Sequence, residues 1–478
     1  MKNTQVGQSS PNPGYKQDIE VIDTANLFNV NNVVFTTQWT LGEKSGSEFT
    51  VIKGGGNFNW LGWNKYIDFL TDKYETVSYG FFCETKSDTT KILAWSDAVG
   101  KSIYFNTIYT TRKGIAERAW VSNDLVLTNE TIKLLIYKGT ISKPYLPYGY
   151  IGIEQSGKNK FNKNKPNIDT SVYITMDGTK IGYAVNNFSI YLPVKSNTHY
   201  VISMDKSSSR FRVACTNSLI KHEKDFAIVP LKAQTNDNGN KIIIQTTKDS
   251  KYLYVNLTDD SNFDSLMIEE NTIVTEYEPY HKPIIYPINL NGNSLAKVEN
   301  IFDVLNIYRN GKVEIKKNTG VLEFNNLALS FSNPNKFQYN ISGLPITFKL
   351  PNALCNYFEN LSEKFDTDSL FMQYITKNNI ENCFNLHPNK SAIRFYSKMI
   401  SSLDEFKNLI NNKDVKLYYN KEFSTVIDLP SIEPIKLWEG TNIFNLITNL
   451  ETEYTVEYVI DKNSIVNESE AVKEGEKI

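Results

Sequence analysis

The chain has 478 residues, of which 40% are hydrophobic and 13% aromatic, and its formal net charge is −2 at pH 7. This length predicts about three domains, and the near-neutral charge argues against nucleic acid as the main partner, because neutralising phosphates needs a basic surface. No apolar run approaches the ~20 residues that span a membrane, so we expect no membrane insertion.

Residues 1–22 contain the turn-rich stretch SSPNPGY and are predicted to form an N-terminal arm. The arm has no apolar segment of the kind found in secretory signals, so we expect the chain to fold in the cytoplasm. The four cysteines are widely spread, and we expect buried free thiols rather than disulfides. They are Cys83, Cys215, Cys355 and Cys383.

Two segments begin and end with the same phrases. One opens with ANLFNVN around Phe28 and closes with KPYLPYG, and the other opens with KNKFNKN around Phe161 and closes with TEYEPYHK. Phe28 corresponds to Phe161 and Tyr148 to Tyr280, so the spacing between the copies is almost the same at both ends. A chance match of short polar phrases is the alternative, but agreement at both ends favours tandem copies of one module, over residues 23–150 and 151–282.

The closing phrases carry paired tyrosines around a proline. Proline fixes φ and extends the residue before it, so each phrase reads as a strand leaving its sheet. We expect the tyrosines to plug the open end of a sandwich, with the ring inward and the hydroxyl toward water. The predicted closing motif is Tyr145, Pro147 and Tyr148 in the first module and Tyr277, Pro279 and Tyr280 in the second.

Both modules are dominated by short runs in which β-branched and aromatic residues alternate with polar ones. Examples are VVFTTQWTL, TVSYGFF and SIYFNTIY in the first, and FSIYLPV, HYVISM and KYLYVNL in the second. This alternation predicts strands. Six or more of them in about 130 residues favour an antiparallel sandwich of the jelly-roll type. The fold class is therefore mainly β, with tandem jelly rolls and then a β-rich C-terminal domain.

The C-terminal domain is predicted over residues 283–461, with one or two short helices. Ser402 and Glu405 form a capping box ahead of Leu403, Phe406, Leu409 and Ile410, which are spaced for one apolar helix face. VKLYYN at 415–420 and EYTVEYVI near the end predict further strands. Residues 462–478 are expected to form a charged tail.

Signatures of catalysis are weak. The four histidines lack metal-ligand spacing, WSDAVGKS lacks the first glycine of a phosphate loop, and DTD at 366–368 is a common tripeptide. A carboxylate pair for glycoside hydrolysis is defined by its separation in space, and no pair is selected by the sequence. We predict no catalytic residue, no metal and no cofactor.

Tryptophan is the positive signal, because five of the six lie in the first module. Trp60 and Trp63 fall in GGGNFNWLGWNKY, which we expect to be a glycine-rich loop. Exposed indoles stack on the apolar faces of sugar rings. The alternative is a core position, which we expect for Trp39 in its alternating strand. The predicted carbohydrate-binding residues are Trp60, Trp63, Trp95 and Trp120.

Several stretches resemble tail-fibre and baseplate proteins of phages that infect Gram-positive bacteria. GQSSPNPGYKQDIEVID is similar to a G-x-S-P-x-P-x-x-P-x-x-I stretch of those proteins, with Tyr15-Lys16 where the third proline falls. SLMIEENTIVTEYEPY resembles the ending of their carbohydrate-binding-module-like jelly rolls, with Asn271 in place of a glycine that the first module keeps as Gly139. SSLDEFKNLINNKDVKLYYNKEFSTVIDLPSI, EGTNIF and VEYVID resemble their C-terminal region.

The resemblance implies a non-enzymatic virion protein of the tail, assembled in the host cytoplasm. The partners it implies are other tail proteins and host cell-wall polysaccharide or teichoic acid. Because tail organelles are rings or fibres, we also expect a homo-oligomer, with a trimer as first choice. Two other functions stay open at this point: a purely architectural tail component, and a tail-associated glycan hydrolase.

Overall fold

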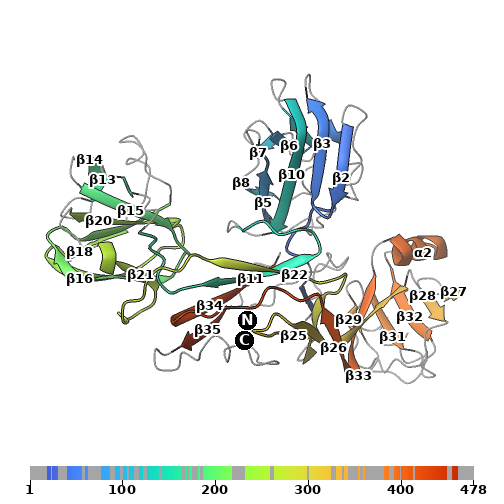
Figure 1. The fold of residues 1–478 in the computed structure, drawn as a ribbon. Helices are drawn as coiled ribbons and strands as arrows, with labels where there is room; N and C mark the ends of the chain where they lie inside the picture. The colour runs from blue at the N-terminus through green and yellow to red at the C-terminus, as the bar shows by residue number, and fades with distance from the viewer. Residues whose placement is uncertain are drawn as a thin grey trace.

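The computed structural model is mainly β, and Figure 1 shows a central body from which three lobes project. In chain order the first lobe lies between β1 and β11, the second between β11 and β22, and the third between β26 and β33. The structure describes residues 19–22, 24–30, 40–55, 60–62, 77–86, 92–96, 101–104, 107–111, 118–121, 126–138, 143–163, 168–169, 172–174, 181–183, 187–217, 232–258, 263–298, 301–324, 330–335, 338–342, 354–355, 359–360, 382–386, 392–398, 400–412, 415–448 and 455–460.

The central body is built from strands that are far apart in the sequence. One sheet has the order β22–β11–β34–β35 (Ile284–Asn289, Tyr150–Ser156, Gly440–Ile447, Thr455–Ile460). The other has the order β25–β26–β33–β29 (Val304–Ile307, Val313–Glu323, Lys416–Leu429, Leu354–Cys355). One apolar cluster joins the two sheets, with Ile151, Ile288 and Phe444 from the first and Val313, Ile315 and Leu429 from the second.

The ends of the predicted domains are arranged differently from our expectation. The predicted arm includes residues 19–22, but these form β1 (Ile19–Ile22), which pairs with β23 (Leu295–Val298) and thereby joins β24 (Ile301–Phe302). We placed a boundary between residues 150 and 151, yet β11 spans that position and pairs with β22 and β34. Alternation within a strand indicates its buried face and does not indicate a partner in a distant part of the chain.

The third lobe is entered through one long pair of strands. β26 and β33 pair first in the central body and then again, beyond a break in register, as residues 319–323 with 416–420. Beyond them lies a sheet of order β27–β28–β32–β31–β30 (Ser330–Asn335, Gln338–Ser342, Ala392–Ser397, Asn382–Leu386, Glu359–Asn360). Its core contains Leu322, Leu417 and Phe395, and it is covered by α2 (Leu403–Asn412) through Phe406 and Ile410.

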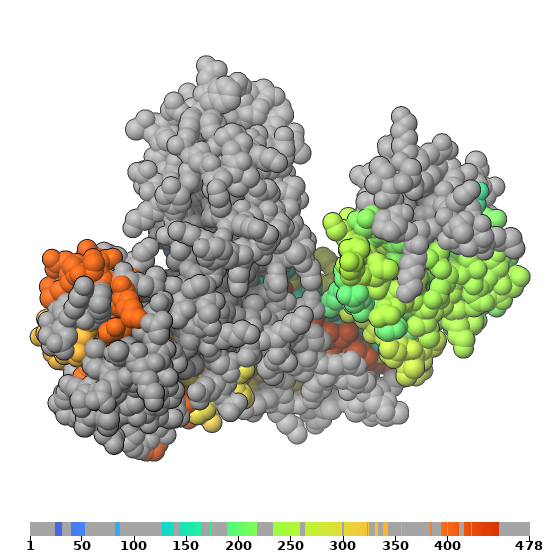
Figure 2. All heavy atoms as spheres, turned by 180° about the vertical axis from the view of Figure 1, so that it is seen from behind, coloured from blue at the N-terminus to red at the C-terminus, as the bar shows by residue number. Residues whose placement is uncertain are grey.

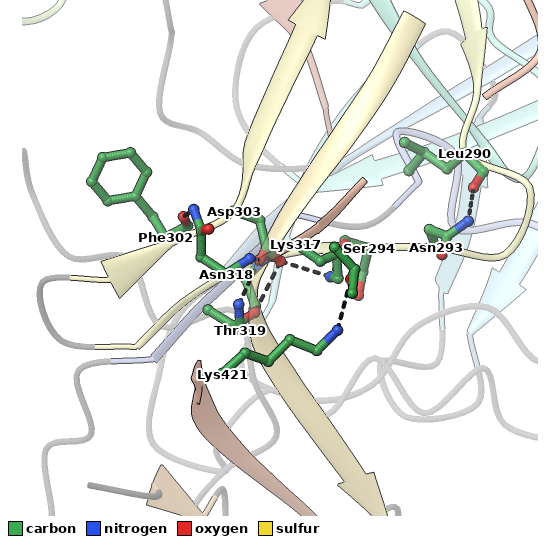
Figure 3. Close-up of polar contacts among 11 residues, drawn as sticks. Leu290, Asn293, Ser294, Phe302, Asp303, Lys317, Asn318, Thr319 and Lys421 are labelled. Atoms are coloured by element: carbon green, nitrogen blue, oxygen red, sulfur yellow. Dashed lines mark hydrogen bonds and ion pairs between the residues drawn. The ribbon is translucent and has the colours of Figure 1, made fainter. Parts of the chain in front are cut away.

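Asp303 holds the break between Lys317 and Thr319 in β26, where this strand leaves the central body (Figure 3). Its fully buried carboxylate accepts hydrogen bonds from the Asn318 and Thr319 amides at 2.8 and 2.9 Å. It also pairs with Lys317 Nζ at 2.6 Å, and this ammonium group donates in turn to the Ser294 carbonyl. Since a buried charge is tolerated only when paired and hydrogen-bonded, this network stabilises the break in register.

The predicted N-cap at Ser402 is confirmed at α2, which is one half of the predicted capping box. The Glu405 amide donates to Ser402 Oγ at 3.1 Å, as in a capped helix. The reciprocal contact differs from our expectation, because the Glu405 carboxylate accepts from the amide and hydroxyl of Ser401 at 2.8 and 2.7 Å. Ser401 and Ser402 together therefore make the contacts that a single N-cap residue makes in a capping box.

Replacing Ser402 by alanine is expected to lower the free energy of unfolding of the third lobe by about 1 kcal/mol, because it removes this N-cap acceptor. Chemical denaturation, followed by a spectroscopic signal of α2, measures the change in the free energy of unfolding. Ser401→Ala serves as the matched variant, because it leaves the Ser402 cap in place and should cost less. An equal cost for both variants would contradict the assignment of the cap to Ser402.

The first lobe has two sheets. One has the order β2–β3–β10–β5–β8 (Thr40–Ser45, Glu48–Gly55, Val126–Lys138, Val77–Glu84, Thr107–Thr111). The other has the order β4–β9–β6–β7 (Trp60–Gly62, Arg118–Val121, Ile92–Ser96, Lys101–Tyr104). Phe49, Val51 and Leu134 are among the buried residues of the first of these sheets.

The second lobe repeats these strand orders. Its sheet β12–β15–β20–β17–β18 (Ile168–Asp169, Asn187–Pro193, Tyr252–Thr258, Arg212–Thr216, Lys232–Thr235) matches β4–β9–β6–β7 from β15 onward. Its sheet β19–β16–β21 (Gly239–Gln245, His199–Ser208, Met267–Glu270) matches β8–β5–β10. A separate hairpin, β13–β14 (Val172–Ile174, Ile181–Tyr183), and the short 3-10 helix η4 (Phe263–Ser265) complete the described part of this lobe.

All four cysteines are buried free thiols, as predicted. Burial, together with the nearby Glu130 and Glu84 carboxylates, raises the pKa of the Cys83 thiol to about 12, so it is unreactive at neutral pH. In the part of the chain that the structure describes, we find no helix with the length and apolar character of a membrane span.

Candidate functional site

Three of the four predicted tryptophans lie on one sheet of the first lobe. Trp60 in β4 is directly opposite Trp120 in β9, and Trp120 is directly opposite Leu93 in β6. Trp95 is two residues beyond Leu93, and residues two apart in a strand share a face. Trp60, Trp95 and Trp120 therefore occupy register positions on one face of β4–β9–β6, which we call the tryptophan face.

The expectation that Trp60 lies in a loop is wrong, because β4 spans Trp60–Gly62 and pairs with β9. The glycines before it suggested a loop, although an aromatic residue such as Trp60 also favours strands. Trp63, the fourth predicted residue, lies outside the described residues. Arg118, which is opposite Trp95, was missed, although it lies two residues before Trp120 in the sequence.

The two faces of this sheet differ in composition. The tryptophan face also has the register positions of Arg118, Ser102 and Tyr104. The opposite face has mainly small or aliphatic residues, with the polar pair Ser96 and Lys101 where β6 ends and β7 begins. The aliphatic and small residues are Leu61, Ile92, Ala94, Ile103, Ala119 and Val121. Such a division is typical of a sheet that packs its aliphatic face against a second sheet.

In the second lobe the corresponding sheet shows which face is buried in the core. Ile190, Val213 and Val255 alternate inward and belong to one apolar cluster with residues of β16 and β19. Tyr191 and Tyr254 lie opposite each other on the other face. Aromatic and polar residues thus occupy the face of this sheet that is turned away from the lobe's core.

A buried asparagine ties the two ends of the first lobe together. Asn26 Nδ2 donates to the Leu134 and Leu146 carbonyls at 2.8 and 3.0 Å. Its Oδ1 accepts from the Phe28 and Ile136 amides at 3.0 and 3.1 Å. Both donor positions and both acceptor positions of the side-chain amide are thus directed to backbone groups, and we call this arrangement the asparagine clamp.

Asn159 makes the same clamp in the second lobe. Its Nδ2 donates to the Leu266 and Glu278 carbonyls at 3.3 and 3.0 Å. Its Oδ1 accepts from the Phe161 and Ile268 amides at 3.0 and 3.2 Å. Each residue of this clamp matches a residue of the first clamp when the repeated phrases are aligned. The N-x-F-N phrase marked these residues in the sequence, but a role for the asparagine was not predicted.

The closing tyrosines differ between the lobes. Tyr145 OH hydrogen-bonds to Ser47 Oγ at 2.7 Å and donates to Glu48 at 3.1 Å, and burial raises the pKa of this phenol. Tyr277 is 39% exposed, and its hydroxyl donates to the Asp264 carbonyl at 2.6 Å. Burial also raises the pKa of Tyr280. The hydroxyls of Tyr145 and Tyr277 are thus bonded to protein groups, whereas we expected them to point to water.

Both lobes are joined to the central body at opposite ends of β34, but the two joints have different chemistry. At the first joint, Leu146 packs with Ala25 and Ile447 in an apolar cluster. In the aligned phrases, Glu278 takes the position of Leu146 and Lys158 that of Ala25, and the charged atoms of this pair are 2.9 Å apart. Glu278 also accepts from the amide and hydroxyl of Thr441 at 2.8 and 2.9 Å.

Other contacts reinforce the second joint. The His281 ring stacks on Trp438 with centroids 4.4 Å apart, and burial lowers the pKa of His281. Beside this joint, within the central sheet, Gln155 Nε2 donates to Asn442 Oδ1 at 2.8 Å. In Figure 2 the green second lobe lies to one side, next to the red surface of the C-terminal strands. The joint is therefore polar, whereas the joint of the first lobe is apolar.

Glu278→Leu is expected to loosen the second joint, since it leaves the Thr441 amide without its acceptor and removes the ion-pair partner of Lys158, which keeps its hydrogen bond to Thr275, at a cost of about 1–3 kcal/mol. Hydrogen exchange at Thr441 should become faster, while exchange in the core of the second lobe should not change. Glu278→Gln keeps an acceptor and is the matched control. Unchanged exchange at Thr441 in the leucine variant would show that the carboxylate does not hold the joint.

Within the described ranges no group of three or more His, Cys, Asp or Glu residues is arranged to hold a metal ion. DTD at 366–368 lies outside the residues that the structure describes. The register of the tryptophan face places three tryptophan positions on neighbouring strands, and tryptophan is a residue type that can stack on the apolar faces of sugar rings.

No protein-family model, no curated protein and no solved structure matches the chain.

Proposed function

We propose that the protein is a non-enzymatic structural component of a phage tail that attaches to host cell-wall glycan through its first lobe. The observation that carries this proposal is the alignment of Trp60, Trp95 and Trp120 on one face of the sheet β4–β9–β6. The resemblance of the opening and closing phrases to tail-fibre and baseplate proteins supports the setting. In this proposal the protein belongs to the virion and is assembled in the host cytoplasm with other tail proteins.

The two lobes are, in this proposal, tandem jelly-roll copies of one carbohydrate-binding-type module. Two independent features support duplication. The strand orders β4–β9–β6–β7 and β15–β20–β17–β18 correspond, and the clamps of Asn26 and Asn159 bond to backbone groups at equivalent positions. Two unrelated sandwiches could share a strand order by chance, but a shared order together with a shared buried side-chain network favours common origin.

Duplication supports an outward direction for the tryptophan face. In the second lobe the aliphatic face of the corresponding sheet packs into the core. If the first lobe packs in the same way, Leu61, Ala94 and Ala119 face inward and the tryptophans face away from the core. An exposed aromatic platform of this kind can stack on sugar rings, while Arg118 and Ser102 supply hydrogen bonds to hydroxyl groups.

Single sugar sites of this type are shallow and weak, so attachment requires many of them. We propose a homo-oligomer, with a trimer as first choice, whose copies act together at high effective concentration. Host wall polysaccharide and teichoic acid are the two candidate polymers. Light scattering that shows a monomer at all concentrations would contradict the oligomer.

The experiment for the proposed function is binding of the purified full chain to an array of wall polysaccharides and teichoic acids from Gram-positive bacteria. We expect binding to a subset of polymers, without release of new reducing ends. The absence of binding to every polymer would favour the purely architectural function. The appearance of reducing ends would favour the glycan hydrolase, which needs two carboxyl groups about 5–10 Å apart in one cleft.

A further inference from the structure

The second lobe has its own aromatic and polar face on the sheet that corresponds to the tryptophan face. Tyr191 in β15 lies opposite Tyr254 in β20, as Trp60 lies opposite Trp120, and the two tyrosine rings are 5.9 Å apart. Arg212 in β17 lies opposite Asn256 on the same face. We call Tyr191, Tyr254, Arg212 and Asn256 the tyrosine face.

The polar groups of the tyrosine face are positioned in advance. Arg212 makes a two-pronged contact with Asp237, from Nε to Oδ1 at 3.0 Å and from Nη2 to Oδ2 at 2.6 Å. Asn256 Nδ2 donates to Ser189 Oγ at 3.3 Å. Rigid planar donors beside aromatic rings are the side chains that sugar-binding faces use. Because Asp237 neutralises Arg212, the face suits a neutral sugar better than an anionic one.

This face is closed in the structure. Tyr254 is 1% exposed, Arg212 5% and Asn256 0%, although all three point away from the core of the lobe. Residues on the outer face of a sheet are this strongly buried only when another segment covers them.

The β13–β14 hairpin contributes to this cover. β13 contacts β15, β17 and β20, the three strands that carry the face, but among the described residues it pairs with β14 and not with these three strands. Tyr173 in β13 lies under the Arg210 guanidinium, 5.7 Å from ring centroid to Cζ. In Figure 1 the hairpin lies beside β15 and β20. A two-stranded hairpin is only marginally stable by itself, so the lobe can retain its two main sheets when the hairpin moves away.

We propose that the tyrosine face is a second sugar-binding site, for a neutral pyranose of a wall glycan, and that the β13–β14 hairpin is its flap. The inference rests on the proposed function of the first lobe. The flap lowers the apparent affinity of the second site by the fraction of time that it is open. Once the first lobe has attached, the high local concentration of glycan favours the open state, and the second site then adds to the attachment.

The test uses the full chain on the array of wall polysaccharides and their oligosaccharides, in a Trp60→Ala/Trp120→Ala background that removes the first site. Replacing residues 172–183 by a short Gly-Ser linker should restore binding in this background. Adding Tyr191→Ala and Tyr254→Ala should then weaken the restored binding by about tenfold or more, since it removes both aromatic rings of the face. A linker variant that folds but does not bind any glycan would overturn the second site.

If the linker variant does not fold, Tyr173→Ala and Arg210→Ala loosen the flap more gently. Nitration of Tyr254, measured by mass spectrometry, should then increase, and an unchanged rate would overturn the flap. The array also separates the two proposals. If the linker variant of the otherwise native chain binds glycan and the native chain does not, the proposed function alone is refuted. If no variant binds glycan, both proposals are refuted.

Discussion

Replacing Trp60 and Trp120 together by alanine is expected to weaken binding to wall glycan about ten- to a hundredfold, because each aromatic contact contributes about 0.5–1.5 kcal/mol. The two residues lie opposite each other on neighbouring strands, so the double variant removes the centre of the tryptophan face. Titration with the polymer that binds best on the array measures the loss. The melting temperature of the first lobe should change little.

The alternative for these residues makes the opposite prediction. If the tryptophans pack in the core, each truncation should cost about 3–5 kcal/mol, and the first lobe should melt early or fail to fold. Phe423→Ala is the control for the loss of an exposed aromatic side chain, since Phe423 is 78% exposed on β33 of the central body. Native-like binding by a well-folded double variant would remove these residues from the site.

Replacing Asn26 by alanine is expected to destabilise the first lobe by about 3–5 kcal/mol, since each hydrogen bond contributes about 1 kcal/mol and an unsatisfied buried group costs about 1–3 kcal/mol. The change removes four hydrogen bonds and leaves the buried Phe28 and Ile136 amides without their acceptor. Denaturation followed by tryptophan fluorescence measures the effect, because five of the six tryptophans lie in residues 23–150.

Asn159→Ala is the matched variant, because it removes the equivalent clamp from the second lobe. It should destabilise the second lobe by a similar amount and leave the fluorescence transition of the first lobe in place. A cost below about 1 kcal/mol for both variants would show that water replaces the clamp. Equal effects of each variant on both lobes would show that the lobes unfold as one unit.

Local patterns in the sequence predicted local structure well. The alternating runs that lie in the described residues form strands, the N-cap at Ser402 begins α2, and the last predicted strand is β35, whereas most of VVFTTQWTL lies outside the described residues. The repeated phrases marked the positions of Asn26 and Asn159, although the clamps that these residues form were not predicted. These features depend on neighbours in the sequence, or on a phrase that occurs twice, and a single sequence contains that information.

The central body could not be predicted in this way. β11 pairs with β34, which lies close to the other end of the chain, and nothing in either strand identifies the other. The same limit applies to the tryptophan face. Composition selected Trp60, Trp95 and Trp120, but only the register of β4, β9 and β6 places them on one face. The covered face of the second lobe was missed because its tyrosines read as ordinary strand residues.

The most direct measurement of the central claim is the set of indole N–H signals in a nuclear magnetic resonance titration with wall glycan. The chain has six tryptophans, and substitutions assign each signal. We predict that the signals of Trp60, Trp95 and Trp120 shift together as glycan is added, while that of Trp438, which donates to the Thr441 carbonyl in the central body, stays in place. Binding of glycan with no change in these three signals would contradict the tryptophan face as the site.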